Sequence, residues 1–314
     1  MIIADKKLKG NIFLAPMAGY TDIAFRTVCF RFGAALAFTE MVSCEALVRG
    51  SRKTFDLLAR GEEEGPLGFQ LFGSDALTIS RAVRIVSSHS PFIIDLNCGC
   101  SVPKVLKTGS GAALLKDPEK LYRIVLSMKE STSLPISIKI RSGWDANSIN
   151  FIEIGKAAEE AGASMVTLHP RTRAQGFSGK AEWKHIAQLK KALKVPVTGS
   201  GDLFTTEDIK RILDFTGCDA VMLARGAIGN PFIFAGRLPG CREKLLTAME
   251  QLKIAIRYKG EKRACKDMRK HIAAYSKGLP DSSRLRNNLI RASSYGEYQK
   301  IISEYLSAHC SKTT

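Results

Sequence analysis

The chain repeats one pattern eight times: a short apolar segment, a few polar or glycine residues, and then a stretch in which apolar residues recur at helical spacing. The apolar segments lie at residues 12–17, 35–40, 67–72, 92–98, 136–141, 165–169, 195–199 and 220–225. Strands that are apolar throughout and alternate with helices belong in a parallel sheet covered on both faces. Because eight such units are present and no Gly-x-Gly-x-x-Gly follows the first strand, the pattern favours a closed (β/α)8 TIM barrel over an open doubly wound sheet.

The last quarter of the chain has a different pattern. Helices are expected between the strands at residues 22–32, 44–58, 75–87, 117–129, 149–161, 183–193, 206–215 and 230–235. After Pro239 and Gly240 no strand-like segment follows, and residues 243–259, 261–277, 281–292 and 295–309 are amphipathic. We therefore predict two domains, a barrel over residues 1–240 and a small all-helical domain over residues 241–314.

The charge of the chain is strongly positive, with a formal net charge of +17. Residues 241–314 hold 16 Lys and Arg against 7 Asp and Glu, a net of +9. This excess predicts a polyanionic partner, nucleic acid before membrane, because no basic amphipathic anchor is evident. The alternative is that the lysines only keep the protein soluble.

The cysteines and the hydropathy pattern indicate the compartment. No run of eighteen apolar residues occurs, and the first ten residues lack the apolar core of a signal peptide. The eight cysteines are scattered without a Cys-x-x-Cys pair. We expect reduced thiols, no metal site, no membrane association, no obligate protein partner and a cytoplasmic location.

The reactive side chains follow the predicted strands, and the active sites of TIM barrels lie at the carboxyl ends of the strands. The fourth strand leads into Asn97-Cys98-Gly99-Cys100. A thiol with the ordinary pKa of about 8.5 is mostly protonated at neutral pH, so Cys100 can donate a proton. The alternative is a buried apolar role, which is the favoured interpretation for Cys98.

Cations and glycines occupy the remaining strand ends. Lys139 and Arg141 share one face of the fifth strand, where they suit an anion or an electron-rich ring, or else extend to solvent. His169 is either a core histidine or part of an anion-facing loop with Arg171 and Arg173. Glycine-rich turns follow the seventh and eighth strands, at residues 198–202 and 224–230, and the exposed N–H groups of such turns predict a phosphorylated cofactor.

Taken together, these segments resemble the flavin-dependent tRNA-dihydrouridine synthases, closest to the bacterial B-type branch. The matching segments are Ala15–Asp22 with Phe25 and Arg26, Thr39–Ser43, Gln70–Gly73, Asp95–Cys100, Lys139–Trp144, His169–Gln175 with Gly179 and Trp183, Gly199–Asp202 and Arg225–Pro231.

The resemblance implies an oxidoreductase that reduces a specific uridine of tRNA to 5,6-dihydrouridine. It implies that NADPH, or NADH, reduces a bound FMN, that the flavin passes hydride to C6 and that Cys100 protonates C5. The cofactor residues that we expect on this basis are Pro16, Met17, Ala18, Gln70, Lys139, His169, Ser200, Gly201, Asp202, Arg225 and Gly226. The uridine and tRNA residues that we expect are Asn97, Arg141, Arg171, Arg173, Lys266, Arg269, Lys270 and Lys277.

The basic helical segment would hold the folded RNA while the target base is pulled out of its stack. Two alternatives remain at this point: an FMN barrel that acts on a small pyrimidine-like molecule, and a tRNA-binding protein with a vestigial flavin site. Ser101, Pro170 and Ser200 depart from the usual residues of the family.

Overall fold

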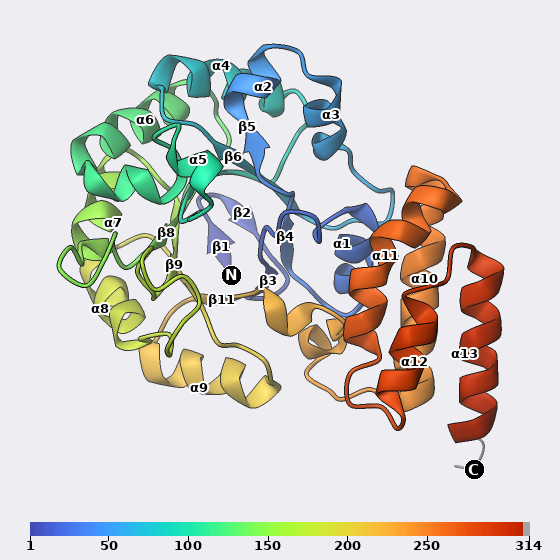
Figure 1. Ribbon diagram of the computed structural model, residues 1–314. Helices are drawn as coiled ribbons and strands as arrows, with labels where there is room; N and C mark the ends of the chain where they lie inside the picture. Colours follow the sequence, from blue (N-terminus) through green and yellow to red (C-terminus); the bar gives the residue numbers. More distant parts are fainter. Residues whose placement is uncertain (310–314) are drawn as a thin grey trace.

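The computed structural model describes residues 1–309 and contains an eight-stranded parallel barrel with a helical segment beside it (Figure 1). The barrel strands are β3 (Ile12–Leu14), β4 (Leu36–Phe38), β6 (Leu67–Phe72), β7 (Ile93–Cys98), β8 (Ile136–Arg141), β9 (Met165–His169), β10 (Val197–Ser200) and β11 (Ala220–Leu223). The pairing of β4 with β6 and of β11 with β3 closes the sheet. The predicted TIM barrel is confirmed.

Helices surround the barrel, and four of them begin at a residue whose side chain caps the helix. The surrounding helices are α1 (Ile23–Arg31), α4 (Ala76–Ser87), α6 (Pro118–Glu130), α7 (Phe151–Glu160), α8 (Lys184–Ala192) and α9 (Thr206–Thr216). The side chains of Asp22, Asp75, Asp117 and Thr205 accept hydrogen bonds from backbone N–H groups at the starts of α1, α4, α6 and α9. A cap of this kind stabilises a helix by about 1 kcal/mol, which explains why these starts agree with the sequence prediction.

Two predicted helices are different in the structure. Residues 42–58 form β5 (Val42–Ser43), α2 (Cys44–Val48), α3 (Arg52–Phe55) and the 3-10 turn η1 (Asp56–Leu58), because Gly50 at φ +75° ends the first helix. Residues 231–235 form the 3-10 turn η4 (Pro231–Ala235) in place of an α-helix. The connections after β7 and β11 contain α5 (Pro103–Leu106), η2 (Gly111–Lys116) and η3 (Arg225–Ala227), which the pattern did not predict.

A short hairpin, β1 (Ile2–Ile3) and β2 (Lys6–Lys7), was also missed. Ile3 of this hairpin and Leu8, which follows it, are buried in a cluster with Phe13, Phe38 and Met222. These residues lie on or next to the barrel strands, so the hairpin covers one opening of the barrel. Burial of each large apolar side chain contributes about 1.5–3 kcal/mol.

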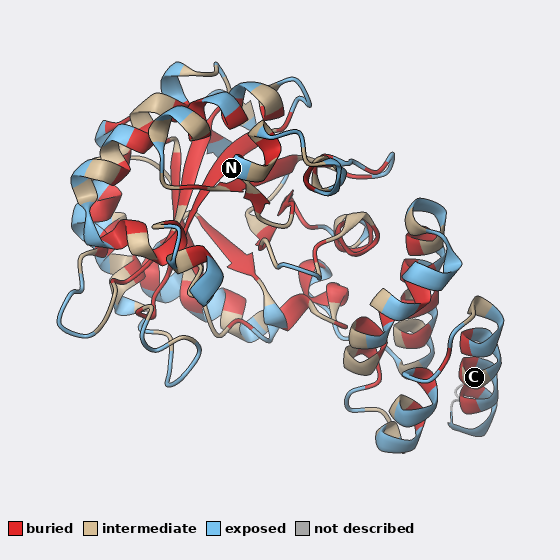
Figure 2. Ribbon diagram, turned by 45° about the horizontal axis from the view of Figure 1, so that its top comes forward, coloured by how far each residue is buried: buried red, intermediate tan, exposed pale blue. Residues whose placement is uncertain are grey.

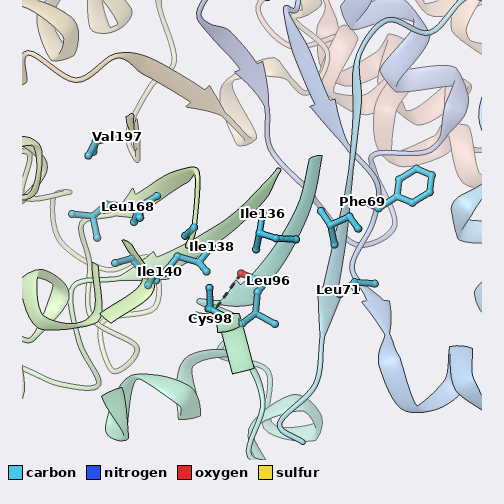
Figure 3. Packing of buried hydrophobic residues seen from close by; sticks show 14 of the residues in the cluster. Phe69, Leu71, Leu96, Cys98, Ile136, Ile138, Ile140, Leu168 and Val197 are labelled. Carbon is cyan, nitrogen blue, oxygen red and sulfur yellow. Dashed lines mark hydrogen bonds between the residues drawn. The ribbon is translucent and has the colours of Figure 1, made fainter. Parts of the chain in front are cut away.

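Successive residues of a barrel strand point alternately toward the surrounding helices and toward the barrel interior. Ile94, Leu96 and Cys98 of β7 are buried with residues of the surrounding helices, and Figure 3 shows Leu96 and Cys98 in this cluster. The Cys98 thiol faces the Leu96 carbonyl oxygen at 3.8 Å, in keeping with the apolar role predicted for it. Asp95 and Asn97 point the other way, toward the barrel interior. Figure 2 shows that burial extends over the strands and the inward faces of the helices.

The helical segment contains α10 (Cys241–Lys259), α11 (Glu261–Tyr275), α12 (Ser282–Leu289) and α13 (Tyr295–His309). Its core includes Ala24 and Val28 of α1, so the segment packs directly on the barrel. At this contact the Lys259 ammonium group donates to Asp22 at 2.6 Å and to Asp267 at 2.9 Å. Within residues 1–309, none of the helices combines the length and the apolar character that crossing a membrane requires.

Candidate active site

A cavity of about 300 Å³ lies at the carboxyl ends of the barrel strands. This size lies at the lower end of the range for small-molecule sites. All of the residues predicted to bind the cofactor line it, namely Pro16, Met17, Ala18, Gln70, Lys139, His169, Ser200, Gly201, Asp202, Arg225 and Gly226. Asn97, Cys100 and Arg141 also line it, so one space contains the predicted cofactor residues and the predicted proton donor.

The backbone of the Cys100 loop is held from both sides. The side-chain oxygen of Asn97 accepts hydrogen bonds from the N–H groups of Gly99 at 3.1 Å and Cys100 at 2.9 Å. The Cys100 carbonyl oxygen accepts from the N–H of Ala112 at 3.0 Å. Gly111 is at φ +64°, and a Cβ there would lie 2.7 Å from the Cys100 carbonyl oxygen, so only glycine fits. These contacts fix a partly exposed thiol at the wall of the cavity.

Lys139 brings a cation to the cavity. Its ammonium group makes no hydrogen bond or ion pair with residues 1–309. Burial and the neighbouring charge of Arg141 lower the pKa of Lys139 to about 8, against a weaker opposing effect of Asp95. A half-buried ammonium group without a partner at the wall of a cavity fits a ligand that supplies hydrogen-bond acceptors.

His169 is neutral in this surrounding. Burial, assisted by the charges of Lys139 and Arg141, lowers the pKa of His169 to about 2. Its Nε2 lies 3.3 Å from a guanidinium nitrogen of Arg171. Because a guanidinium group only donates, Nε2 accepts this bond and the ring proton is on Nδ1.

The arginines predicted to contact substrate hold loops in place. Arg141 is buried and donates to the carbonyl oxygens of Gly99 at 2.8 Å, Thr172 at 3.0 Å and Gly176 at 2.8 Å. It therefore joins the Cys100 loop to the loop after β9. Burial and the charge of Arg171 lower the pKa of Arg141 to about 10.

Two arginines that were predicted to contact the tRNA backbone pack against side chains of the protein itself. Arg171 is 2% exposed and donates to both carboxylate oxygens of Asp202, at 2.9 and 2.7 Å. The ion pair leaves Arg171 almost no exposed surface, and its contact with an RNA phosphate stays a prediction. The Arg173 guanidinium packs over the Trp144 ring at 4.5 Å, with the Lys116 ammonium group at 3.6 Å from the centre of the same ring.

The two glycine-rich turns leave no room for side chains. Gly201 is at φ +105°, and a Cβ at Gly226 would lie 2.0 Å from the Leu203 carbonyl oxygen. Arg225 stands beside the second turn, with its guanidinium 4.6 Å from the centre of the Phe177 ring. Close backbone turns with a neighbouring cation fit a phosphate group. The Ser200 hydroxyl donates to the Met222 carbonyl oxygen at 2.9 Å.

Sequence reasoning missed several apolar residues at the cavity. They are Met41, Val102, Phe177, Phe204 and Met222. Phe177 is 60% exposed. The sequence feature that could have identified it is an aromatic residue between Gly176 and Gly179 in an otherwise polar loop.

The candidate tRNA residues of the helical segment lie outside the cavity. Lys266, Arg269 and Lys277 are exposed, on α11 and the turn after it. Lys270 is closer to the barrel, with its ammonium group 5.0 Å from the centre of the Tyr20 ring. Tyr20 belongs to the same loop as the cavity residues Met17 and Ala18. No group of three or more His, Cys, Asp or Glu side chains suited to a metal ion occurs in the part of the chain that the structure describes.

Comparison with known proteins identifies the family. A model of the family described as dihydrouridine synthase matches residues 13–309. The chain belongs to the dihydrouridine synthase family. A probable tRNA-dihydrouridine synthase of Treponema pallidum is 39% identical over 96% of this chain and 94% of its own length. A tRNA-dihydrouridine synthase B of Pasteurella multocida is 36% identical over 89% of this chain and 87% of its own length. The predicted family resemblance is confirmed.

Solved structures share the barrel of this dihydrouridine synthase family member at low sequence identity. A 2-naphthoyl-CoA reductase in complex with 2-naphthoyl-CoA has a TM-score of 0.59 and 12% identity over 74% of this chain. A 6-hydroxypseudooxynicotine amine oxidase from Pseudomonas geniculata has a TM-score of 0.58 and 14% identity over 74% of this chain. The chain spans about half of each of these proteins, 50% and 47%. At this identity the likeness concerns the fold alone.

Proposed function

We propose that this chain reduces a uridine of tRNA to 5,6-dihydrouridine, with FMN bound in the barrel cavity and NADPH as the reductant. Family membership supports the reaction. The observation that carries the proposal is that one cavity joins an unpartnered cation, two glycine turns and a held thiol, at Lys139, Gly201, Gly226 and Cys100. The tRNA substrate makes the cytoplasm the expected location.

The residues that would hold the flavin divide by chemistry. The turns at Gly201 and Gly226, with Arg225, would bind the phosphate. Lys139 and Gln70 would donate hydrogen bonds to the ring oxygens and nitrogens. Neutral His169 would add a hydrogen bond without a further charge. When bound, the flavin supplies the hydride that is added at C6 of the uridine.

Cys100 would supply the proton that C5 requires. Addition of hydride to C6 leaves excess electron density at C5, and proton transfer from the thiol completes the saturated C5–C6 bond. The thiol is then a thiolate and recovers its proton from solvent. Asn97 and Arg141 line the same wall and would contact the uracil.

Residues 241–314 would form the tRNA-binding domain. A flipped-out base requires a protein that holds the surrounding RNA, and exposed cations bind phosphates without regard to sequence. Lys266, Arg269 and Lys277 would contact the backbone from α11 and the turn that follows. Lys270 would do so next to the cavity, since it lies over Tyr20.

The experiment combines purified protein with unmodified tRNA, FMN and NADPH, and maps dihydrouridine at each position. Deletion of the gene in its host supplies the matching measurement in cells. We expect dihydrouridine at a defined position in vitro and its loss in the deletion strain. Reduction of free uridine but not of tRNA would favour the small-pyrimidine alternative. A protein that binds tRNA but takes up no flavin would contradict both enzymatic hypotheses, reduction of a tRNA uridine and reduction of a small pyrimidine.

A further inference from the structure

A buried aspartate inside the barrel is connected to the Cys100 loop through two side-chain amides. Asp95 is 1% exposed, and its Oδ2 accepts a hydrogen bond from Nε2 of Gln70 at 2.7 Å. Oε1 of Gln70 accepts from Nδ2 of Asn97 at 2.8 Å. Oδ1 of Asn97 accepts from the backbone N–H groups of Gly99 and Cys100. The hydrogen bonds therefore run without a break from a carboxylate to the backbone of Cys100.

Each amide in this chain of bonds has one orientation that satisfies both neighbours. A carboxylate only accepts hydrogen bonds, so Gln70 turns its NH2 group toward Asp95 and its carbonyl oxygen toward Asn97. Asn97 must then direct its own NH2 group to Gln70. Its carbonyl oxygen is left for the two backbone N–H groups, which only donate. The carboxylate at one end and the backbone N–H groups at the other end therefore require the same orientation of both amides.

We propose that Asp95 is a positioning residue that orients Asn97 through Gln70 and thereby holds the Cys100 loop at the cavity. Gln70 and Asn97 line the cavity and Asp95 does not, so Asp95 acts through them. The inference rests on the proposed function, in which the Cys100 thiol must reach one carbon of the substrate.

The burial of Asp95 supports a specific role. Burial raises the pKa of the Asp95 carboxyl to about 6, although the hydrogen bonds from Gln70 and Ser137 and the charge of Lys139 oppose this shift. A buried carboxylate is costly, and an apolar side chain would fill a purely structural position at lower cost. Ser137 donates to the other carboxylate oxygen at 2.6 Å and has no connection to the Cys100 loop. This second bond supplies a matched control.

The test measures the rate at which iodoacetamide alkylates Cys100 in the full-length protein without flavin or tRNA, followed by mass spectrometry of the peptide. Asp95→Leu removes the acceptor and leaves the Gln70 amide free to turn. We expect alkylation of Cys100 to become about fivefold faster, the factor for the loss of the neutral hydrogen bond from the Cys100 N–H to Asn97 once the amides can turn. Buried Cys98 reports on general loosening of the same strand, and we expect it to stay unreactive.

Two further variants distinguish the loss of the hydrogen-bond acceptor for Gln70 from other effects of changing the buried Asp95 side chain. Asp95→Asn can still turn an oxygen toward Gln70, so we expect a rate within about twofold of wild type. Ser137→Ala breaks only the second bond to Asp95, and we expect the same for it. In the dihydrouridine assay we expect Asp95→Leu to be slow and Asp95→Asn to recover most of the activity.

An unchanged alkylation rate in Asp95→Leu would overturn the inference, as would equal acceleration in Ser137→Ala. Faster reaction of Cys98 together with Cys100 would also overturn it, because that indicates general unfolding. If Asp95→Leu does not fold, Gln70→Met interrupts the same chain of bonds and the same expectations apply. The alkylation assay needs no turnover, so its result is independent of whether Cys100 proves to be the acid.

Discussion

Replacement of Lys139 by methionine tests whether the cavity is built to bind a ligand rich in hydrogen-bond acceptors. Lowering the pKa of Lys139 from 10.5 to about 8 corresponds to about 3 kcal/mol of penalty on the charged form. Methionine removes this penalty and fits a similar space. The shift already includes the attraction to the Asp95 carboxylate, so we expect a gain of about 3 kcal/mol in the stability of the flavin-free protein at pH 7.

The pH dependence of this gain follows from the same shift. Between pH 8 and 10.5 the unfolded chain binds more protons at Lys139 than the folded protein does. The stability of wild type therefore rises with pH in this range relative to Lys139→Met, and the advantage of the variant shrinks. Below pH 8 both states of wild type carry the proton, so the advantage stays constant with respect to this group.

The assay is urea unfolding of the flavin-free wild type and variant at pH 7 and at pH 9.5, followed by titration with FMN. Lys210→Met is the control, since Lys210 is exposed on α9. We expect Lys139→Met to bind FMN at least about tenfold more weakly, the value for a lost charged hydrogen bond. A variant that is less stable than wild type at pH 7, or that binds FMN equally well, would refute the reasoning.

Three further substitutions test other parts of the site. Cys100→Ala should keep its flavin and its reduction by NADPH but form dihydrouridine at least about 100-fold more slowly; equal rates would exclude Cys100 as the acid. Gly226→Ala should lose flavin binding, because its Cβ would lie 2.0 Å from a backbone carbonyl oxygen, whereas Gly296→Ala, with open space around it, should bind FMN normally. Lys266→Glu combined with Arg269→Glu should raise the KM for tRNA and reduce its salt dependence while flavin reduction by NADPH is unchanged; an unchanged KM would remove α11 from the RNA interface.

The sequence alone determined the elements of the barrel and the residues at its mouth. Hydrophobic periodicity is local, so a wholly apolar run such as Ile12–Leu14 or Ala220–Leu223 identifies a buried parallel strand without knowledge of its neighbours. In a closed barrel the carboxyl ends of all strands converge. Polar residues in the last part of different strands, such as Gln70, Lys139 and His169, could therefore be assigned to one cavity before their contacts were known.

The direction and surroundings of individual side chains came only from the tertiary structure. Arg171 has the sequence setting of a phosphate contact, yet the loop after β9 folds back and pairs it with Asp202, thirty-one positions away. Register likewise places Gln70 beside Asp95 and Asn97 beside Lys139 on neighbouring strands. Such pairings join residues far apart in the chain, and no local periodicity encodes them. The sequence therefore predicted which groups meet at the cavity, and the packing of strands and loops decided which of them hold the loops and which face the cavity.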